Sequence, residues 1–340
     1  CAAPAVSLTT PLEAANHPRS PLHKKRHGPI EHHLAEHPMK FYRLIDAAGS
    51  QRLAVENGDG QLHDLTSADE DISDVEELVR ASSLSGVSID ALTDRLLKGA
   101  SAETHDLAQL IEDSRDGSGE FVLDRPFDPP EVWAAGVTYK SSEMERRRES
   151  DTPDVYAKVY AAERPELFLK ATSERCVGPF ESVGIRSDSA WNVPEPELAF
   201  VTYKGEIVGY TIGNDMSSRS IEGENPLYLP QAKVYDRSCA IGPCFVTPEA
   251  IGDPQDLSVR CIVSRDGAEV FSGETSTSLM ARTCEELSDW LHRSNTIPNM
   301  TAVLTGTPVV PPPDFTLAEG DIVTIEIQGI GTLENDVVVV

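Results

Sequence analysis

Short stretches rich in β-branched and aromatic residues recur along the second part of the chain and predict that it is mostly β. The clearest pair spans 198–203 and 206–212 on either side of Lys204-Gly205, the pattern of a β-hairpin with a tight turn. A turn is also expected at Asp266-Gly267. One or two helices are expected in this part of the chain, and a capping box that begins at Thr283 predicts where one of them starts. Further strands are expected at 133–139, 257–263, 268–274 and 323–327.

Residues 39–128 carry a different pattern and are predicted to form a small N-terminal α+β domain. Strands are expected at 40–45 and 51–56, and apolar residues recur at helical spacing within 74–98. No group of catalytic residues is visible there, so we expect this domain to support packing or a dimer. Residues 129–340 are then expected to form the catalytic domain.

Residues 1–38 differ from everything that follows them. They contain six of the nine histidines and four Lys or Arg against three Glu, whereas the chain from Met39 on has 53 acidic and 25 basic residues. We therefore expect a disordered or non-native extension. Metal binding by this histidine-rich tract is the alternative.

The open end of the hairpin brings acidic residues together. If Lys204-Gly205 is the loop, paired residue numbers sum to 409, and Glu197 should face Ile212. Residues i and i+2 project from one face of a strand, so Glu195 and Glu197 point together, with Asp215 beside them. Unpaired carboxylates repel one another, whereas a hard cation such as Mg²⁺, Mn²⁺ or Ca²⁺ accepts oxygen ligands alone. The alternative is an edge hairpin whose acidic side chains are solvated.

Charge narrows the range of partners. The 340 residues include 56 acidic and 29 basic ones, for a net charge of −27. An excess spread over the whole chain favours a halophilic protein, because concentrated salt screens the repulsion; an acidic surface for a basic partner usually appears as one local block. The lack of a basic patch argues against nucleic acid, and no apolar run approaches the roughly 20 residues that span a bilayer. Six cysteines without a C-x-x-C pair favour a reducing cytoplasm.

Eight short motifs occur in order and together resemble the fumarylacetoacetate hydrolase superfamily over roughly residues 130–335. They are Gly136-x-x-Tyr139, Leu167-Phe168-Leu169-Lys170, Glu195-x-Glu197-Leu198, Gly209-Tyr210-Thr211, Asn214-Asp215-x-Ser217-x-Arg219, Lys233-x-x-Asp236, Ile241-Gly242-Pro243 and Gly306-Thr307-Pro308. The resemblance implies a mixed β-sandwich roll, a homodimer or dimer of dimers, and a divalent cation, Mg²⁺ first among them, held by Glu195, Glu197 and Asp215.

One departure from the superfamily pattern narrows the expected reaction. Hydrolases and decarboxylases of this superfamily carry a His–Glu pair after the first motif; here Ser142 stands at the His position, while Glu145 keeps the Glu. In this the chain looks more like the branch of 2-keto-3-deoxy-D-arabinonate (D-xylonate) dehydratases. That branch implies a cytoplasmic hydro-lyase that makes 2,5-dioxopentanoate in oxidative pentose degradation. The alternatives are an acylpyruvate hydrolase or oxaloacetate decarboxylase on the same fold, or a catalytically inactive binding protein.

Dehydration of a small 2-oxo acid needs groups that move protons near the cation. Lys233 is the first candidate for the base, or for the acid after proton transfer, and Glu166 is the second; a structural ion pair and a surface acid are their alternatives. Lys170 either faces the substrate carboxylate or neutralises the ligand cluster. Thr307 is expected to hydrogen-bond that carboxylate, and Arg219 to be structural. The substrate-binding candidates are Lys170, Thr307, Ser142 and Glu145, of which the last two are expected to close over the site.

Overall fold

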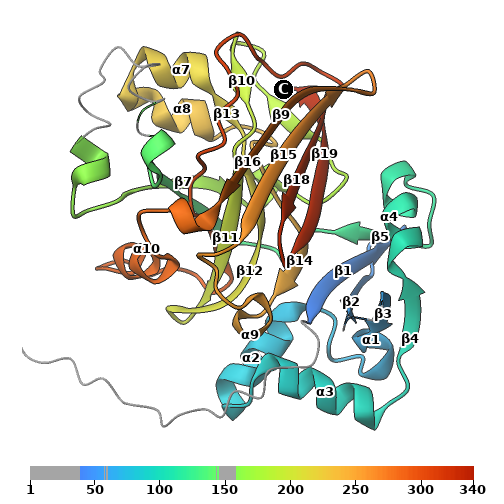
Figure 1. Ribbon diagram of the computed structural model, residues 1–340. Coiled ribbons are helices and arrows are strands. Elements are labelled where there is room, and N and C mark those ends of the chain that lie inside the picture. Colours follow the sequence, from blue (N-terminus) through green and yellow to red (C-terminus); the bar gives the residue numbers. More distant parts are fainter. Residues whose placement is uncertain (1–38, 57, 59, 143, 145–157) are drawn as a thin grey trace, which may run out of the picture. The chain divides into compact units, whose positions relative to one another are not determined.

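The computed structural model describes residues 39–340 except 57, 59, 143 and 145–157 (Figure 1). The predictions for residues 1–38 and for Glu145 lie outside the described residues. Within the described part, no helix combines the length and apolar character needed to cross a membrane.

The larger of two main sheets has the strand order β4-β3-β2-β1-β14-β12-β11-β17-β6-β7, with β5 on β1 and β8 on β14. Its strands are β1 (Lys40–Asp46), β2 (Gln51–Glu56), β3 (Gln61–Asp64), β4 (Glu103–Asp106), β5 (Phe121–Asp124), β6 (Glu131–Gly136), β7 (Glu166–Thr172), β8 (Cys176–Val177), β11 (Pro196–Tyr203), β12 (Glu206–Asp215), β14 (Cys239–Val246) and β17 (Thr301–Leu304). The strands predicted at 40–45 and 51–56 are confirmed as β1 and β2.

The second sheet has the order β16-β15-β18-β19-β9 and packs face to face on β11, β12 and β14 (Figure 1). Its strands are β9 (Val183–Ile185), β15 (Ser258–Arg265), β16 (Ala268–Ser276), β18 (Ile322–Ile327) and β19 (Gly331–Val339), and a small separate pair joins β10 (Asn192–Val193) to β13 (Ser217–Ser218). Side chains such as Phe200 and Ile212 from one sheet and Val259 and Ile325 from the other form the core between them. The predicted mixed β-sandwich is therefore confirmed.

Helices cover the edges of this sandwich. They are α1 (Leu65–Ala68), α2 (Val75–Ser85), α3 (Ile89–Gly99), α4 (Leu107–Asp116), α7 (Arg219–Glu224), α8 (Leu229–Lys233), α9 (Pro248–Ile251) and α10 (Cys284–Leu291), with short 3₁₀ turns at Ser173–Arg175, Pro226–Tyr228 and Thr277–Leu279. The helical pattern at 74–98 resolves into α2 and α3, because Gly86 ends α2 in the left-handed conformation (φ 70°). Thr283 caps α10 as predicted, accepting a hydrogen bond from the Glu286 amide.

The predicted boundary at residue 128 falls within the larger sheet. Strand β1 pairs with β14, with Lys40 opposite Val246 and Phe41 opposite Phe245. The division into 39–128 and 129–340 remains a prediction, but hydrogen bonds between strands join the two parts.

The hairpin of β11 and β12 forms around Lys204-Gly205 as predicted, but its predicted register is wrong. Near the turn, Tyr203 pairs with Glu206 and the numbers sum to 409; beyond a β-bulge at Val201/Thr202 the sum becomes 410, and Glu197 lies opposite Gly213 rather than Ile212. A bulge inserts one extra residue into one strand and so shifts every later pair. The consequence is that Asp215, not Asn214, lies opposite Glu195, with the Asp215 amide donating to the Glu195 carbonyl at 3.0 Å.

Candidate active site

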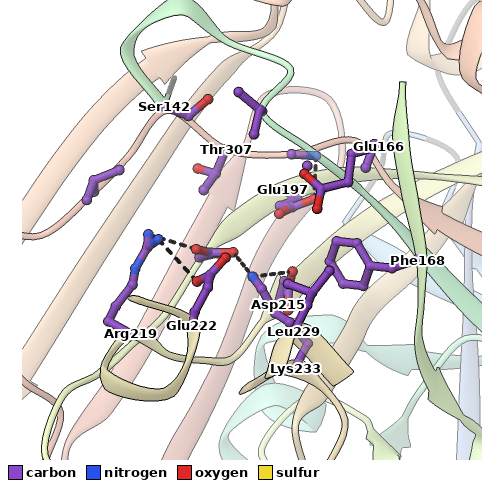
Figure 2. Close-up of a pocket in the computed structure, with 16 residues that line it drawn as sticks. Ser142, Glu166, Phe168, Glu197, Asp215, Arg219, Glu222, Leu229, Lys233 and Thr307 are labelled. Atoms are coloured by element: carbon purple, nitrogen blue, oxygen red, sulfur yellow. Dashed lines mark hydrogen bonds and ion pairs between the residues drawn. The ribbon is translucent and has the colours of Figure 1, made fainter. Parts of the chain in front are cut away.

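A cavity of about 30 Å³ lies at the end of this hairpin (Figure 2). Its walls come from the hairpin, from β6 and β7, from α7 and α8, and from the loop after β17. The carboxylates of Glu195, Glu197 and Asp215 line it, each no more than 3% exposed. One ligand oxygen of each lies within 4.8 Å of the others. The bulge explains this convergence, because residues paired in an antiparallel ladder share a face.

Two lysines and an arginine surround these carboxylates. Lys233 Nζ, at the end of α8, lies 2.5 Å from Glu195 Oε2 and 2.8 Å from Asp215 Oδ2, and 2.5 Å from the hydroxyl of Ser217. Lys170 Nζ pairs with Asp215 Oδ1 at 2.7 Å, and Arg219 Nη2 pairs with Glu195 Oε1 at 2.8 Å. Burial alone would raise the pKa of Asp215, but the two lysines outweigh it and hold that pKa below its ordinary value.

Glu197 has unfavourable surroundings for a negative charge. Burial and the neighbouring charges of Asp215 and Glu195 raise its pKa well above its ordinary value. The Gly306 amide donates to it at 2.5 Å, and that approach requires glycine: φ is +89°, and a Cβ there would lie 2.9 Å from the Ala135 carbonyl oxygen.

The side chains around the cavity carry a net negative charge that a divalent cation would balance. When all are ionised, five carboxylates face three cationic side chains, so the group carries a formal charge of −2. Oxygen ligands with a net negative charge suit Mg²⁺, Mn²⁺ or Ca²⁺. The three carboxylates at the end of the hairpin fit such a cation. The carboxylates are Glu166, Glu195, Glu197, Asp215 and Glu222, and the cations are Lys170, Arg219 and Lys233.

The two candidates for proton transfer both line the cavity. Figure 2 shows Glu166 pointing into it from β7 and Lys233 from α8. Glu166 is the first residue of β7 and pairs with Gly136, where any Cβ would collide with the Glu166 carboxylate. The structure thus brings together an acid and a lysine beside the carboxylates, as their proposed roles require.

Of the described substrate-binding candidates, two line the cavity and one does not. Ser142 and Thr307 line the cavity. The Ser142 hydroxyl donates to the Tyr139 carbonyl at 2.8 Å, and that of Thr307 accepts from the Val309 amide at 3.1 Å. Lys170 is not among the lining residues, and its contact with Asp215 fits the alternative role of neutralising the ligand cluster.

Three residues that line the cavity were not predicted from the sequence as part of the site. Arg219, expected to be structural, lines the cavity while it pairs with Glu195; its neighbour Glu222 lies 3.6 Å away and lines it too. Residues three apart share a helix face, so a helix predicted directly after Asp215 would have indicated both. Phe168 also lines the cavity, 5.6 Å from Lys233 Nζ to the ring centre, and its i+2 spacing from Glu166 on β7 was the available signal.

Comparison with known proteins gives consistent matches. The chain is 48% identical over 303 residues to the "Probable 2-keto-3-deoxyxylonate dehydratase" of Haloferax volcanii, covering 88% of this chain and 99% of that protein. It is 47% identical over 219 residues to the "2-dehydro-3-deoxy-D-arabinonate dehydratase" of Saccharolobus solfataricus, covering 62% and 72%.

A solved structure described as "2-keto-3-deoxy-D-arabinonate dehydratase complexed with magnesium and 2,5-dioxopentanoate" superposes with a TM-score of 0.75 at 36% identity, covering 88% of this chain and 99% of that chain. The family described as "Fumarylacetoacetate (FAA) hydrolase C-terminal" matches residues 131–338. The motifs, the sandwich of two sheets and these matches agree, and the chain belongs to the fumarylacetoacetate hydrolase family.

Proposed function

We propose that this chain is a Mg²⁺-dependent hydro-lyase that converts 2-keto-3-deoxy-D-arabinonate, which is also 2-keto-3-deoxy-D-xylonate, into 2,5-dioxopentanoate. The observation that carries the proposal is one cavity that holds three buried carboxylates, Lys233 and Glu166. The names of the Haloferax and Saccharolobus relatives and of the magnesium complex support the same reaction.

Glu195, Glu197 and Asp215 would hold the cation. When bound, a divalent cation acts as a Lewis acid that polarises the 2-oxo group and acidifies the C3 hydrogens. Thr307 is suited to bind the substrate carboxylate, because its hydroxyl lines the cavity and still has a hydrogen to donate after accepting from Val309.

Lys233 and Glu166 divide the proton transfers in this proposal. Lys233, acting as the neutral amine, takes a proton from C3, and Glu166, acting as the protonated acid, gives one to the C4 hydroxyl, which leaves as water. The two groups end the step as the ammonium and the carboxylate. The C3–H and C4–O bonds break and a C3=C4 double bond forms. A proton then moves from C5 to C3, which gives an enol, and the proton of the 5-hydroxyl group moves to C4, which gives the aldehyde. The contacts of Lys233 Nζ with Glu195, Asp215 and Ser217 fix its position among the carboxylates of the cavity and support this role.

The rival hydrolase reaction needs an activated water, for which relatives use the His–Glu pair. The sequence has no histidine between His105 and His292, and Ser142 stands at the histidine position in the cavity wall. A dehydratase does not need that histidine, so activity on the sugar acid should not require Ser142→His.

The purified protein with Mg²⁺ should be offered 2-keto-3-deoxy-D-arabinonate, an acylpyruvate and oxaloacetate in parallel, with and without excess chelator. We expect 2,5-dioxopentanoate from the first compound, abolished by the chelator. Rapid cleavage of the acylpyruvate without dehydration of the sugar acid would instead support a hydrolase.

The setting proposed for this enzyme is the cytoplasm of a salt-loving cell, with a homodimer or dimer of dimers as the assembly. The net charge of −27 and the Haloferax relative support salt adaptation, and the family resemblance supports the assembly. Light scattering in concentrated salt should give a mass of two or four chains.

A further inference from the structure

Two separate stretches of chain that reach the cavity are both attached to residues 280–282. The first precedes Ser142. The Ala281 amide donates to the Thr138 carbonyl at 2.9 Å, and Tyr139 forms an isolated antiparallel bridge with Met280. This attachment lies just before the residue that lines the cavity.

The second stretch precedes Glu166 and is attached through the Arg282 side chain. Arg282 Nη2 donates to the Ala162 carbonyl at 2.6 Å, and Nη1 donates to the Glu163 carbonyl at 3.1 Å. The next residue, Arg164, stacks on the ring of Trp290 in α10, with its guanidinium carbon 4.5 Å from the ring centre. Arg282 therefore holds the backbone three residues before Glu166.

Helix α10 fixes the position of Arg282 itself. The guanidinium pairs with Glu286 in the first turn of the helix, and its side chain is 11% exposed. Thr283 caps the helix, and Leu287 and Leu291 bury its inner face in the core. Because α10 is anchored in this way, Arg282 offers a rigid fork for two carbonyls rather than a freely rotating surface charge.

The distance along the chain from this fork to the cavity is short. Only Arg164 and Pro165 separate Glu163 from Glu166, so a displacement at Glu163 would carry to the start of β7 with little chain to absorb it. Beyond Glu166, the pairing of β7 with β6 begins at Gly136 and holds the rest of the strand. The contacts of Arg282, together with the stacking of Arg164 on Trp290, thus attach the chain on the side of Glu166 that lacks strand pairing to β6.

We propose that Arg282 is a positioning residue for Glu166. By holding the Ala162 and Glu163 carbonyls, it sets where β7 begins and how the Glu166 carboxylate enters the cavity. The kinetic part of this inference rests on the proposed dehydratase function, in which Glu166 gives a proton to the leaving hydroxyl. Proton transfer depends on heavy atoms within hydrogen-bond reach, so a small displacement of Glu166 should slow the chemical step.

The kinetic test is a double-mutant cycle with Arg282→Ala and Glu166→Gln. Arg282→Ala alone should lower kcat roughly ten- to a hundredfold while KM changes less than about twofold, because the reacting geometry is lost and not the binding of substrate. In the Glu166→Gln background the same substitution should lower kcat by less than about twofold, since the group that it positions no longer acts. Equal losses in both backgrounds would overturn the proposal.

Two further variants separate positioning from a general loss of structure. Arg282→Lys keeps a charge near Glu286 and one donor for the carbonyls, so it should fold like the wild type and recover part of kcat. The control is Arg260→Ala on β15, because Arg260 likewise forms ion pairs with glutamate, at 3.4 Å with Glu274 and 3.7 Å with Glu326, and does not line the cavity. It should leave kcat unchanged; a loss equal to that of Arg282→Ala would overturn the specific role.

Hydrogen exchange tests the positioning without any enzyme activity. The backbone amides at the start of β7, residues 166–168, should exchange faster in Arg282→Ala than in the wild type or in Arg260→Ala. Unchanged exchange there would overturn the proposal. If the wild type does not dehydrate the sugar acid, the proposed function fails while this measurement still decides whether Arg282 holds the segment.

Discussion

Two regions of the described chain bury basic side chains among carboxylates, and they differ in how much water reaches those carboxylates. The cavity cluster consists of Glu195, Glu197, Asp215, Lys170, Arg219 and Lys233, and the Arg43 cluster consists of Arg43, Asp74, Asp124 and Asp128. In the Arg43 cluster one guanidinium, 1% exposed, meets aspartates that each keep part of their surface in water.

The two clusters treat their carboxylates differently. Burial would lower the pKa of Arg43, but Asp74, Asp128 and Asp124 outweigh it and raise that pKa. Against the effect of burial, Arg43 and the neighbouring Arg125 hold the pKa of Asp128 below its ordinary value, whereas burial raises the pKa of Asp124. In the cavity cluster, burial and like charges raise the pKa of Glu197 well above its ordinary value. A buried ion pair alone therefore does not indicate a functional site. A better indicator is a buried carboxylate that lines a cavity and whose charged form is destabilised by its neighbours.

The largest expected effect comes from Glu197. Glu197→Gln removes one oxygen ligand and its charge, so activity should fall about a thousandfold or more while Mg²⁺ binding weakens. Because the substitution also removes a buried charge next to Asp215 and Glu195, the melting temperature without metal should stay the same or rise. Activity, titration calorimetry and thermal melts would show this; full activity with weakened melting would contradict the contrast between the clusters.

Lys233 should show the next largest effect. Lys233→Met should lower the rate about a hundredfold to ten-thousandfold, as for loss of a general base, and abolish exchange of the C3 hydrogens with deuterated solvent. Nuclear magnetic resonance of the substrate in D₂O would follow both. Retained exchange at C3 would assign the base to another residue and leave Lys233 as an ion pair for Glu195 and Asp215.

The Arg43 cluster should respond in stability rather than in rate. Arg43→Met leaves three aspartates without their shared cation, and because these remain partly hydrated the loss should be about 2 kcal/mol. Denaturant unfolding would measure it, and kcat of the folded variant in high salt should match the wild type. A loss of kcat without a loss of stability would remove the distinction between the two clusters.

Local sequence patterns predicted much of this molecule, and the parts they missed have a common cause. Alternation and turn residues predicted the hairpin, and the acidic residues at its end predicted the cluster of three carboxylates that is proposed to hold a cation. The bulge that places Asp215 opposite Glu195 was missed, because it depends on how β12 fits between β11 and β14. The partners of Arg43 were missed because Asp74 and Asp128 lie 31 and 85 residues away in sequence.

Salt should affect the charged surface more than either buried cluster. The Debye length grows from about 3 Å at 1 M salt to about 10 Å at 0.1 M, so dilution exposes the repulsion behind the net charge of −27. The melting temperature should therefore fall as salt is diluted, with a similar slope in Glu197→Gln. A flat series, or one that falls with added salt, would contradict salt adaptation.

Asp90 offers a test that is confined to pH dependence, because it is a buried carboxylate bonded to a hydroxyl. It is 7% exposed, its partner is Thr247 Oγ1 at 3.0 Å, and burial raises its pKa to about 6. The folded state then binds the proton more tightly than the unfolded state, so this group makes stability fall as pH rises from about 4 to about 6, by about 3 kcal/mol at most. In Asp90→Asn that part of the pH dependence of unfolding should vanish; an unchanged profile would assign it elsewhere.

The central claim is that Glu195, Glu197 and Asp215 together hold a divalent cation. Anomalous diffraction from crystals soaked in Mn²⁺ tests it most directly. We predict one strong peak within about 2.0–2.6 Å of a carboxylate oxygen from each of the three residues. A soaked crystal with no peak at the end of the hairpin, or with its strongest peak away from these carboxylates, would contradict the account.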